Sequence, residues 1–223
     1  IIAVSNYTKY TIVKHYGISP DKIRVVHNAV DPKLYLQNEQ RTKFGTKDKV
    51  VLFLGRITLQ KGPDYFLRAA KKVLQFEKDV KFIFAGSGDM EAQMIRQAAE
   101  MGLAKHVLFT GFLQGSDVDR AFQMADVYVM PSVSEPFGIT PLESLINGTP
   151  VIISKQSGVA EVLHNCLKVD FWDIDELTNQ IVAVLRYQES LGLTLVEHGK
   201  QEVYAMSWDK VGEKIHRVYR ELF

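Results

Sequence analysis

The chain has 223 residues, of which 46% are hydrophobic and 24% charged, as is usual for a globular protein with a full core. Its formal net charge of +1 excludes the strong overall field that would favour nucleic acid or an anionic membrane. The single cysteine excludes an internal disulfide and is typical of a reducing compartment, and no apolar run approaches the roughly 20 residues that span a bilayer.

The two ends of the chain differ from its body. Residues 1–4 have the pattern of a strand, residues 7–16 that of a helix, and IRVVHNAVD, residues 23–31, that of an extended linker. Because a protein rarely begins in mid-strand, and neither a start methionine nor a signal peptide is present, we expect a fragment of a longer polypeptide. Residues 207–223 predict a helix with one apolar stripe, formed by Trp208, Val211, Ile215, Val218 and Tyr219.

Apolar runs alternate with amphipathic segments through the body of the chain. The runs predict strands at 50–54, 80–85, 106–110, 126–130, 150–154 and, weakly, 166–169. The segments of 3.6-residue period predict helices at 63–76, 89–102, 116–125, 140–147, 157–163 and 175–185. Several runs are apolar on both faces, as strands covered by two helical layers must be. The order predicts an α/β fold, a doubly wound (Rossmann-like) parallel sheet whose ligands bind beyond the carboxyl ends of the strands.

The first of these carboxyl-end loops is LGRITLQKGPD, residues 54–64, which carries Gly55, Arg56, Lys61 and Gly62. Glycines let a bulky anion approach the backbone, and the helix that follows offers unpaired N–H groups. The two cations can add charge-assisted hydrogen bonds of about 1.5–3 kcal/mol each, enough to hold a diphosphate. A solvated surface loop explains the spacing equally well, and the GxxxxGK[ST] pattern of a Walker loop is not present.

The next loop, AGSGDME at residues 85–91, contains Gly-x-Gly after a strand. Glu91 stands where a dinucleotide-binding fingerprint has its third glycine, so the pattern favours a tight turn. A ligand can still lie against the backbone at Gly86 and Ser87.

Two Asp-x-Asp pairs, Asp117 with Asp119 and Asp173 with Asp175, have the spacing of a metal–nucleotide site. Both pairs lie at expected helix starts, where the helix dipole favours acids, and Ser116 can cap the first of these helices. We therefore interpret them as structural. The six histidines do not cluster with one another or with the cysteine, so no metal site is expected.

The stretch SEPFGITPLESLINGTP, residues 134–150, holds two glutamates around a turn. Glu143 fits a capping box, with Thr140 at the N-cap and Pro141 at the first helical position. Glu135 precedes a proline at the end of a strand, where no helix requires an acid. A carboxylate beside a glycine turn whose N–H groups attract anions suits a ligand with hydroxyls at one end and phosphates in its middle.

GRITLQKG together with EPFGITPLE closely resembles the donor-binding half of the retaining GT-B glycosyltransferases, glycosyltransferase family 4 (group 1). Glu135 and Glu143 match the family's E-x7-E element. The resemblance extends through HNAVD, AGSGD, FTGFL, SGVAEVL and the MSW near the C-terminus. Two departures are Ala29, where the family usually has Asn-Gly, and HNCLKVD, which is shorter and less glycine-rich than usual.

The resemblance implies a role for each matching residue. Arg56 and Lys61 would bind the donor diphosphate and stabilise its charge as it leaves, Glu135 would bind hydroxyls of the transferred sugar, and Glu143 would bind the ribose. The implied catalytic residues are Arg56, Lys61 and Glu135. The implied donor-binding set is Gly55, Arg56, Lys61, Gly86, Ser87, Phe112, Leu113, Glu135, Phe137, Gly138, Ile139, Thr140 and Glu143.

The resemblance also implies a domain order and a reaction. Residues 1–35 would be the end of a preceding acceptor domain with its linker, residues 36–206 the nucleotide-sugar-binding domain, and residues 207–223 a helix that crosses back. The reaction would retain anomeric configuration and transfer a hexose-type sugar from a UDP- or GDP-linked donor to a glycan or lipid, without metal or other cofactor.

The partners expected are the nucleotide sugar and the preceding acceptor domain, without nucleic acid. The fragment alone would be inactive, and the location cytoplasmic, with any membrane contact made by the absent domain. Three alternatives stay open: a GT-B nucleotide-sugar epimerase, a phosphorylase, which needs a pyridoxal-phosphate lysine that the sequence does not single out, and a non-catalytic nucleotide-binding module.

Overall fold

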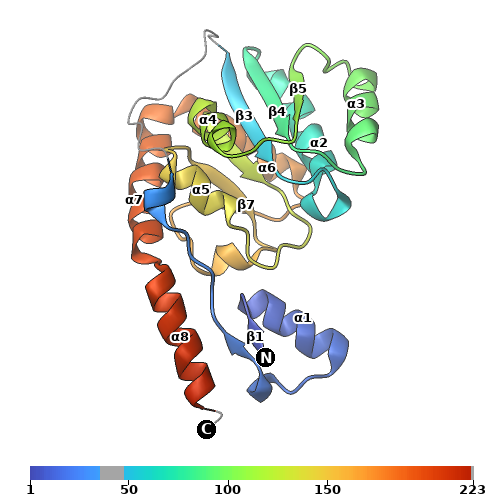
Figure 1. Cartoon of the computed structure of the whole chain (residues 1–223). Helices are drawn as coiled ribbons and strands as arrows, with labels where there is room; N and C mark the ends of the chain where they lie inside the picture. The colour runs from blue at the N-terminus through green and yellow to red at the C-terminus, as the bar shows by residue number, and fades with distance from the viewer. Residues whose placement is uncertain (36–47, 222–223) are drawn as a thin grey trace.

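The structure, a computed structural model, describes residues 1–35 and 48–221 (Figure 1). The expected domain boundary at residue 36 and the last two residues of the chain lie outside this part. Within the described residues no helix is long and apolar enough to cross a membrane.

A six-stranded, wholly parallel sheet forms the centre of the larger part of the molecule. Its strands are β3 (Lys49–Leu54), β4 (Val80–Ala85), β5 (Val107–Gly111), β6 (Val127–Met130), β7 (Val151–Ser154) and β8 (Leu167–Val169). Their order across the sheet is β5-β4-β3-β6-β7-β8, so the winding reverses between β3 and β6. The predicted doubly wound α/β fold is confirmed, and the strands lie where the apolar runs placed them to within about a residue at most ends.

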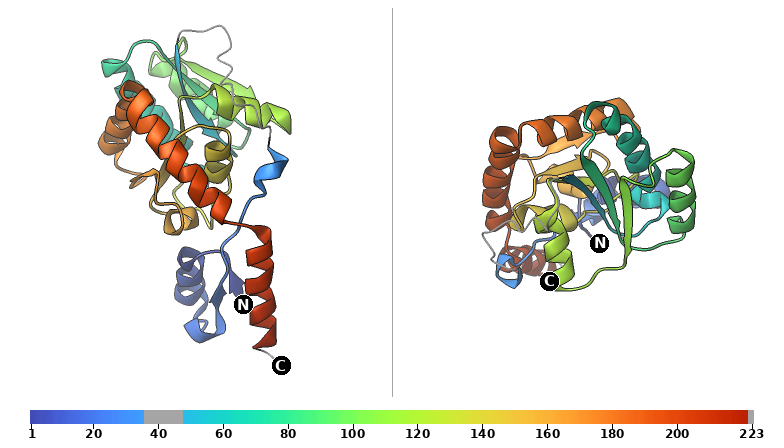
Figure 2. Two further views of the ribbon diagram at one scale, coloured as in Figure 1. Left: turned by 90° about the vertical axis from the view of Figure 1, so that its left-hand side faces the viewer. Right: turned by 90° about the horizontal axis from the view of Figure 1, so that it is seen from above.

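Helices cover both faces of the sheet, as Figure 2 shows. They are α2 (Pro63–Phe76), α3 (Glu91–Glu100), α4 (Ser116–Met124), α5 (Thr140–Ile146), α6 (Ile174–Arg186) and α7 (Leu193–Ala205). Side chains of α2, α3 and α6, such as Phe66, Met94 and Ile181, share one buried cluster. Those of α4, α5 and α7, such as Phe122 and Leu142, belong to another on the opposite face. The sheet is therefore buried on both sides, which explains why its strands read as continuous apolar runs.

The N-terminal segment forms a small unit of its own. Strand β1 (Ile2–Ala3) pairs in parallel with β2 (Arg24–Val25), and α1 (Asn6–Tyr16) connects them. Helix α8 (Trp208–Arg220) runs back alongside this unit, as Figures 1 and 2 show. Val211 of α8 is buried against Val26 and Ala29, whereas Trp208 and Tyr219 of the same predicted stripe are 50% and 55% exposed.

Two local predictions were wrong. Residues 157–163 form only a short 3₁₀ turn at Gly158–Glu161, because the backbone of residues 158 and 159 is hydrogen-bonded to residues 135 and 137 instead of continuing a helix. Ser116 does not cap α4: the N-cap is Gly115, and Ser116 is already helical. Asp173 does cap its helix, accepting a hydrogen bond from the Glu176 N–H at 3.0 Å. A π-helical turn (Gln188–Gly192) and α7 follow α6, in a stretch where no helix had been predicted.

Candidate functional site

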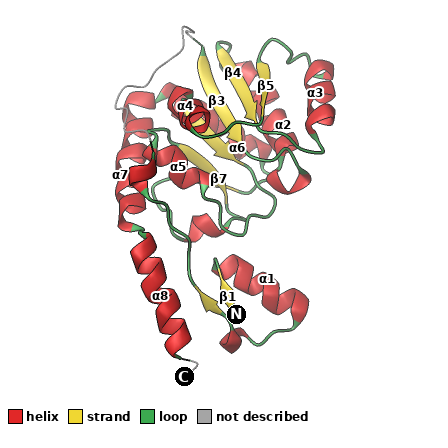
Figure 3. Cartoon of the chain, in the orientation of Figure 1, coloured by secondary structure: helices red, strands yellow, loops and turns green. Residues whose placement is uncertain are grey.

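The reversal of strand order places an opening at the carboxyl ends of β3 and β6. Because the chain leaves β3 toward one edge of the sheet and β6 toward the other, the loops at 55–62 and 131–139 diverge there, which is where ligands bind in doubly wound sheets. Figure 3 shows these loops on the side of the sheet that faces the N-terminal segment. The first loop carries two of the predicted catalytic residues and the second loop carries the third.

The two loops are packed tightly together. Gly62 has a φ of +67°, and a Cβ built on it would lie 2.2 Å from the carbonyl oxygen of Pro131, so only glycine fits. The Val133 N–H donates to the Gln60 carbonyl at 2.9 Å, and the Gln60 side-chain amide donates to the Ser134 carbonyl at 2.9 Å. Gln60 was not predicted as a site residue, because its role is a contact between loops about 74 residues apart in the sequence.

Lys61 and Glu135 form a salt bridge across this junction. Their side chains are only 21% and 10% exposed, so both charges are largely removed from water. Arg56 lies apart from the pair: it is exposed, with its guanidinium 3.4 Å from the side-chain oxygen of Gln60. The structure thus joins two of the three predicted catalytic side chains and places the third, hydrogen-bonded to Gln60, on the exposed side of the same loop.

The backbone around Glu135 is fixed by its neighbours. The Glu135 N–H donates to the Gln156 carbonyl at 3.1 Å, and the Glu135 carbonyl accepts from the Gly158 N–H at 3.0 Å. Phe137, which follows, is buried. Gly138 then turns the chain with a φ of +95°, a conformation that favours glycine.

The turn ends in unused donors. Among the described residues, the N–H groups of Gly138, Ile139 and Thr140 donate to no protein acceptor. They therefore offer hydrogen bonds to an anionic ligand beside the Lys61–Glu135 pair.

The prediction of a capping box formed by Thr140 and Glu143 was wrong. Helix α5 begins at Thr140, and its N-cap is Ile139, whose backbone is already helical and whose side chain cannot cap. The Thr140 hydroxyl is instead 2.8 Å from the hydroxyl of the buried Tyr128. The Glu143 carboxylate is left free of the helix end and accepts a hydrogen bond from the Tyr35 hydroxyl at 3.1 Å.

The surroundings of Glu143 favour its protonated form. Burial raises the pKa of this carboxyl, against a hydrogen bond from Tyr35 that lowers it, and the nearby Asp119 raises it further. Burial, together with the Glu143 charge, also raises the pKa of the Tyr35 phenol, which remains a neutral donor. These groups line a cavity of about 440 Å³ formed by Leu34, Tyr35, Gly115, Ser116, Val118, Asp119 and Glu143.

Two of these residues had been predicted differently or missed. Asp119 had been interpreted as a structural acid at a helix start; it does lie in the first turn of α4, but it is also buried and accepts a hydrogen bond from the Asn147 side chain at 3.0 Å. Its partner in the motif, Asp117, is exposed and pairs with Arg120 at 3.2 Å, as a first-turn acid does. Tyr35 was missed because it ends the segment interpreted as a linker, and no local pattern connects it with a glutamate 108 positions later.

A second cavity of about 440 Å³ adjoins the first, and Val118 lines both. Its lining residues are Leu54, Gly55, Arg56, Ala85, Gly86, Ser87, Phe112, Leu113 and Val118. Six of the predicted donor-binding residues therefore lie around one hollow. Its floor is backbone, since a Cβ on Gly86 would lie 2.0 Å from the Gly55 carbonyl oxygen. The Phe112 side chain is 70% exposed and offers a flat apolar surface.

The site as a whole has three chemically distinct parts. The second cavity can take a flat apolar group, the Glu143 carboxylate can accept hydrogen bonds from hydroxyls, and the loops after β3 and β6 combine cations and free N–H groups with Glu135. No cluster of histidine, cysteine and acidic side chains suited to a metal ion occurs in residues 1–35 and 48–221. The arrangement suits an elongated ligand with an anionic centre.

Comparison with protein-family models gives two adjoining matches. Residues 36–188 match the model described as glycosyl transferases group 1, and residues 1–34 match the model described as glycosyltransferase family 4. The first match covers more than half of the chain.

Individual proteins agree with the family match. An uncharacterized glycosyltransferase of Methanocaldococcus jannaschii is 33% identical, over 99% of this chain and 59% of that protein. A D-inositol 3-phosphate glycosyltransferase of Acidothermus cellulolyticus is 30% identical, over 94% of this chain and 50% of that protein. The structure of Anabaena HepE in complex with UDP-glucose has the same fold, with a TM-score of 0.86 at 21% identity, over 99% of this chain and 63% of that one. The chain thus spans about half to two thirds of the length of these proteins.

Proposed function

The chain belongs to the glycosyl transferase group 1 family, and we propose that it holds the nucleotide-sugar donor of a retaining glycosyltransferase. The whole protein would transfer a hexose-type sugar from a UDP- or GDP-linked donor to a glycan or lipid acceptor. The observation that carries this proposal is the meeting of Lys61 with Glu135 at the reversal of strand order, beside free backbone donors.

The donor would lie along the three parts of the site. The base would enter the cavity between Gly86 and Phe112, and the ribose hydroxyls would bond to Glu143. The diphosphate would take the free N–H groups of residues 138–140 together with Lys61 and Arg56, and the sugar hydroxyls would reach Glu135. The binding of UDP-glucose by HepE, a neighbour in fold, supports a uridine donor as the first one to test.

The same groups would act on the reaction. When the bond between the anomeric carbon and the diphosphate oxygen breaks, the electron pair leaves with the diphosphate. The acceptor oxygen bonds to the anomeric carbon on the same face and passes its proton to the departing diphosphate. Lys61 and Arg56 would stabilise the charge that develops on the diphosphate. Because two protein cations are available for that task, we propose a reaction that requires no metal or other cofactor.

The domain order is part of the proposal. Residues 36–206 would form the donor domain, and residues 1–35 would end a preceding acceptor domain and link the two. Residues 207–223 would cross back toward that domain, which the packing of Val211 on Val26 and the 2.8 Å salt bridge between Arg24 and Glu221 support. A donor domain without its acceptor domain would bind the nucleotide sugar and turn over little or none of it. We place the protein in the cytoplasm, with any membrane contact made by the acceptor domain.

The experiment is a transfer assay with the whole protein, UDP- and GDP-hexoses and a panel of glycan and lipid acceptors. We expect one donor to release its nucleoside diphosphate, a product with the donor's anomeric configuration by NMR, and a rate about 10²-fold lower for Lys61→Ala. An epimerised nucleotide sugar instead of a glycoside would favour the epimerase, and a protein that binds donors without consuming any would favour the non-catalytic module.

A further inference from the structure

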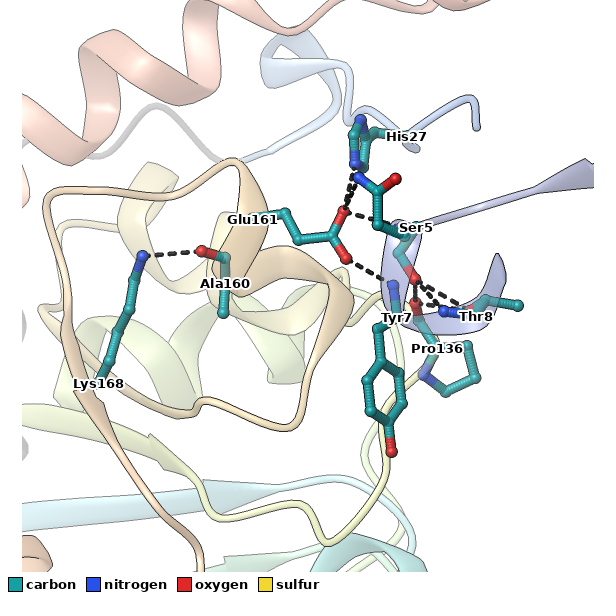
Figure 4. Close-up of polar contacts among 9 residues, drawn as sticks. Ser5, Tyr7, Thr8, His27, Pro136, Ala160, Glu161 and Lys168 are labelled. Atoms are coloured by element: carbon teal, nitrogen blue, oxygen red, sulfur yellow. Dashed lines mark hydrogen bonds and ion pairs between the residues drawn. The ribbon is translucent and has the colours of Figure 1, made fainter. Parts of the chain in front are cut away.

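The loop that carries Glu135 is held by the first turn of α1. The hydroxyls of Ser5 and Thr8 both donate to the Pro136 carbonyl, at 2.5 and 3.1 Å (Figure 4). The Tyr7 hydroxyl donates to the Ser134 hydroxyl at 3.0 Å. Residues on both sides of Glu135 are therefore bonded to one helical turn more than 120 positions earlier in the chain.

Glu161 ties the same turn to the larger part of the molecule. Its carboxylate accepts the backbone N–H groups of Asn6 and Tyr7, at 2.9 and 2.8 Å, and the Asn6 side-chain amide at 2.9 Å. The His27 ring nitrogen lies 2.9 Å from the same carboxylate (Figure 4). Acids are favoured at helix N-termini, so the charge of Glu161 suits this position.

The contact leaves no spare room. A Cβ on Gly158 would lie 2.2 Å from the Pro136 carbonyl oxygen and 2.5 Å from the Ser5 Cβ. The Gly158 N–H also donates to the Glu135 carbonyl at 3.0 Å. Three segments, the start of α1, residues 134–137 and residues 157–161, thus meet in one close-packed junction.

The two sides of this junction match different family models. Residues 1–34 match one family model and residues 36–188 the other. The cavity lined by Gly86 and Phe112 has no residue in the junction. A movement of α1 would therefore act directly on the loop of Glu135, and on that cavity only through other residues.

We propose that Ser5, Tyr7, Thr8 and Glu161 are positioning residues that fix Glu135 for the donor sugar, so that the segment joined to the preceding domain sets the sugar-binding half of the site. This inference rests on the proposed function for the identity of the ligand. The position of the loop itself does not depend on that identity. The junction would make sugar binding follow the position of the preceding domain more closely than nucleotide binding does, because the base cavity has no residue in the junction.

The experiment compares Thr8→Ala and Glu161→Gln with Thr11→Ala in the whole protein. Thr11 is the matched control, because its hydroxyl bonds, among the residues that the structure describes, only to the Tyr7 carbonyl within α1, at 3.0 Å. Hydrogen exchange is measured at the amides of Glu135 and Gly158, with strand β6 as the internal reference. We expect exchange at these two amides to be about tenfold faster in Thr8→Ala and Glu161→Gln, and unchanged in Thr11→Ala and in β6. Unchanged exchange at both amides would overturn the proposal.

Calorimetric affinities for UDP and UDP-glucose give the second readout. We expect the two junction variants to lose about tenfold more affinity for UDP-glucose than for UDP. An equal loss for both ligands would overturn the positioning role. If the unmodified protein binds neither ligand, the proposed donor is wrong, and the exchange rates alone then decide whether the junction holds the loop.

Discussion

Lys61 and Glu135 are the two residues on which the site depends most, and they also stabilise each other. Each has lost most of its hydration, and neither charge has another partner among the bonds of the described residues. In such a pair, removal of one member leaves the other charged and buried, which is more costly than removal of both. The pair therefore has a structural effect that must be separated from its effect on ligand binding.

Lys61→Ala should lower the free energy of unfolding by about 2–3 kcal/mol, because Glu135 is then left without its counter-charge. Lys61→Ala combined with Glu135→Gln should recover a large part of that loss. Urea denaturation measures both, and Lys71→Ala, at an exposed lysine of α2, is the control, with a change within about 0.5 kcal/mol. Equal stabilities for the single and double variants would show that the salt bridge does not stabilise the fold.

The charged form of Glu143 lowers the free energy of unfolding of the chain. Its pKa in the folded state lies above the ordinary value of 4.5, because of burial and the neighbouring Asp119 and despite the hydrogen bond from Tyr35. The folded state then binds a proton more tightly than the unfolded state. The free energy of unfolding therefore falls as the pH rises from 4.5 through the raised pKa.

Glu143→Gln should accordingly raise the melting temperature at pH 7 and leave it unchanged below about pH 4, where the glutamate is protonated in both states. The measurement is thermal unfolding at both pH values, with Glu213→Gln, at an exposed position of α8, as the control. A stabilisation of the same size at both pH values would mean that the charge of Glu143 is not its cause.

At the scale of elements, the ends of β3 and β4 form the floor of the candidate base cavity. Gly55 and Gly86 have φ values of +150° and +138°, and the Gly55 N–H donates to the Ala85 carbonyl at 2.9 Å. Backbone packs on backbone there, so no side chain larger than hydrogen fits between the strands at Gly86. This close contact between the two backbones therefore both shapes the cavity and stabilises the carboxyl ends of β3 and β4.

Gly86→Ala should destabilise the chain by about 2–4 kcal/mol, since the new methyl group meets a carbonyl oxygen in a backbone conformation that strains alanine. Gly212→Ala is the matched control. Gly212 lies in α8 with open space around its Cβ position, so this change should stabilise by roughly 0.5–1 kcal/mol. Denaturant titration of both variants tests the pair, and a neutral Gly86→Ala would contradict the close packing.

The sequence predicted the sheet well because its signals are local. Strands such as β6 and β7 are buried on both faces and appear as unbroken apolar runs. Helix α7 escaped prediction because it buries few residues, among them Gly199 and Val203. The capping box at Thr140 was wrong because the threonine hydroxyl is taken by Tyr128, a tertiary partner that no local motif shows.

The candidate site was predictable to a similar degree and for similar reasons. Loops after parallel strands meet at one edge, so the predicted residues around Gly86 and Phe112 do line one cavity. The sequence did not predict the contact of Lys61 with Glu135, the hydrogen bond from Tyr35 to Glu143, or the burial of Asp119. Each of these depends on segments that only the fold brings together.

In the molecule as a whole, the C-terminal helix α8 packs on the N-terminal unit and so brings the two ends of the described chain together. Its buried side chain, Val211, packs on Val26 and Ala29 with the partly buried Ile215, whereas Trp208 and Tyr219 remain exposed. The position of the N-terminal unit thus depends on a small apolar contact as well as on the polar junction around Glu161.

Val211→Asp should release α8 from the N-terminal unit. In the packed arrangement the aspartate would be buried in an apolar contact without a partner, which is unfavourable, so the contact should open. Limited proteolysis should then cut faster around residues 205–210, while the melting temperature of the sheet changes little. Tyr219→Asp, at a position of α8 that is 55% exposed, is the control and should leave the cleavage rate unchanged. Equal cleavage of the two variants would show that Val211 does not hold the helix.

Calorimetric titration of the whole protein with UDP, GDP and ADP decides whether the carboxyl ends of β3 and β6 hold a nucleotide-sugar donor. We predict that one of these nucleoside diphosphates binds, and that Lys61→Ala weakens it by about 10- to 100-fold, as the loss of a charge-assisted hydrogen bond requires. Glu143→Gln should weaken it as well, and Lys71→Ala should not. No binding at millimolar ligand, or binding that Lys61→Ala and Glu143→Gln leave unchanged, would contradict a donor site at the carboxyl ends of β3 and β6.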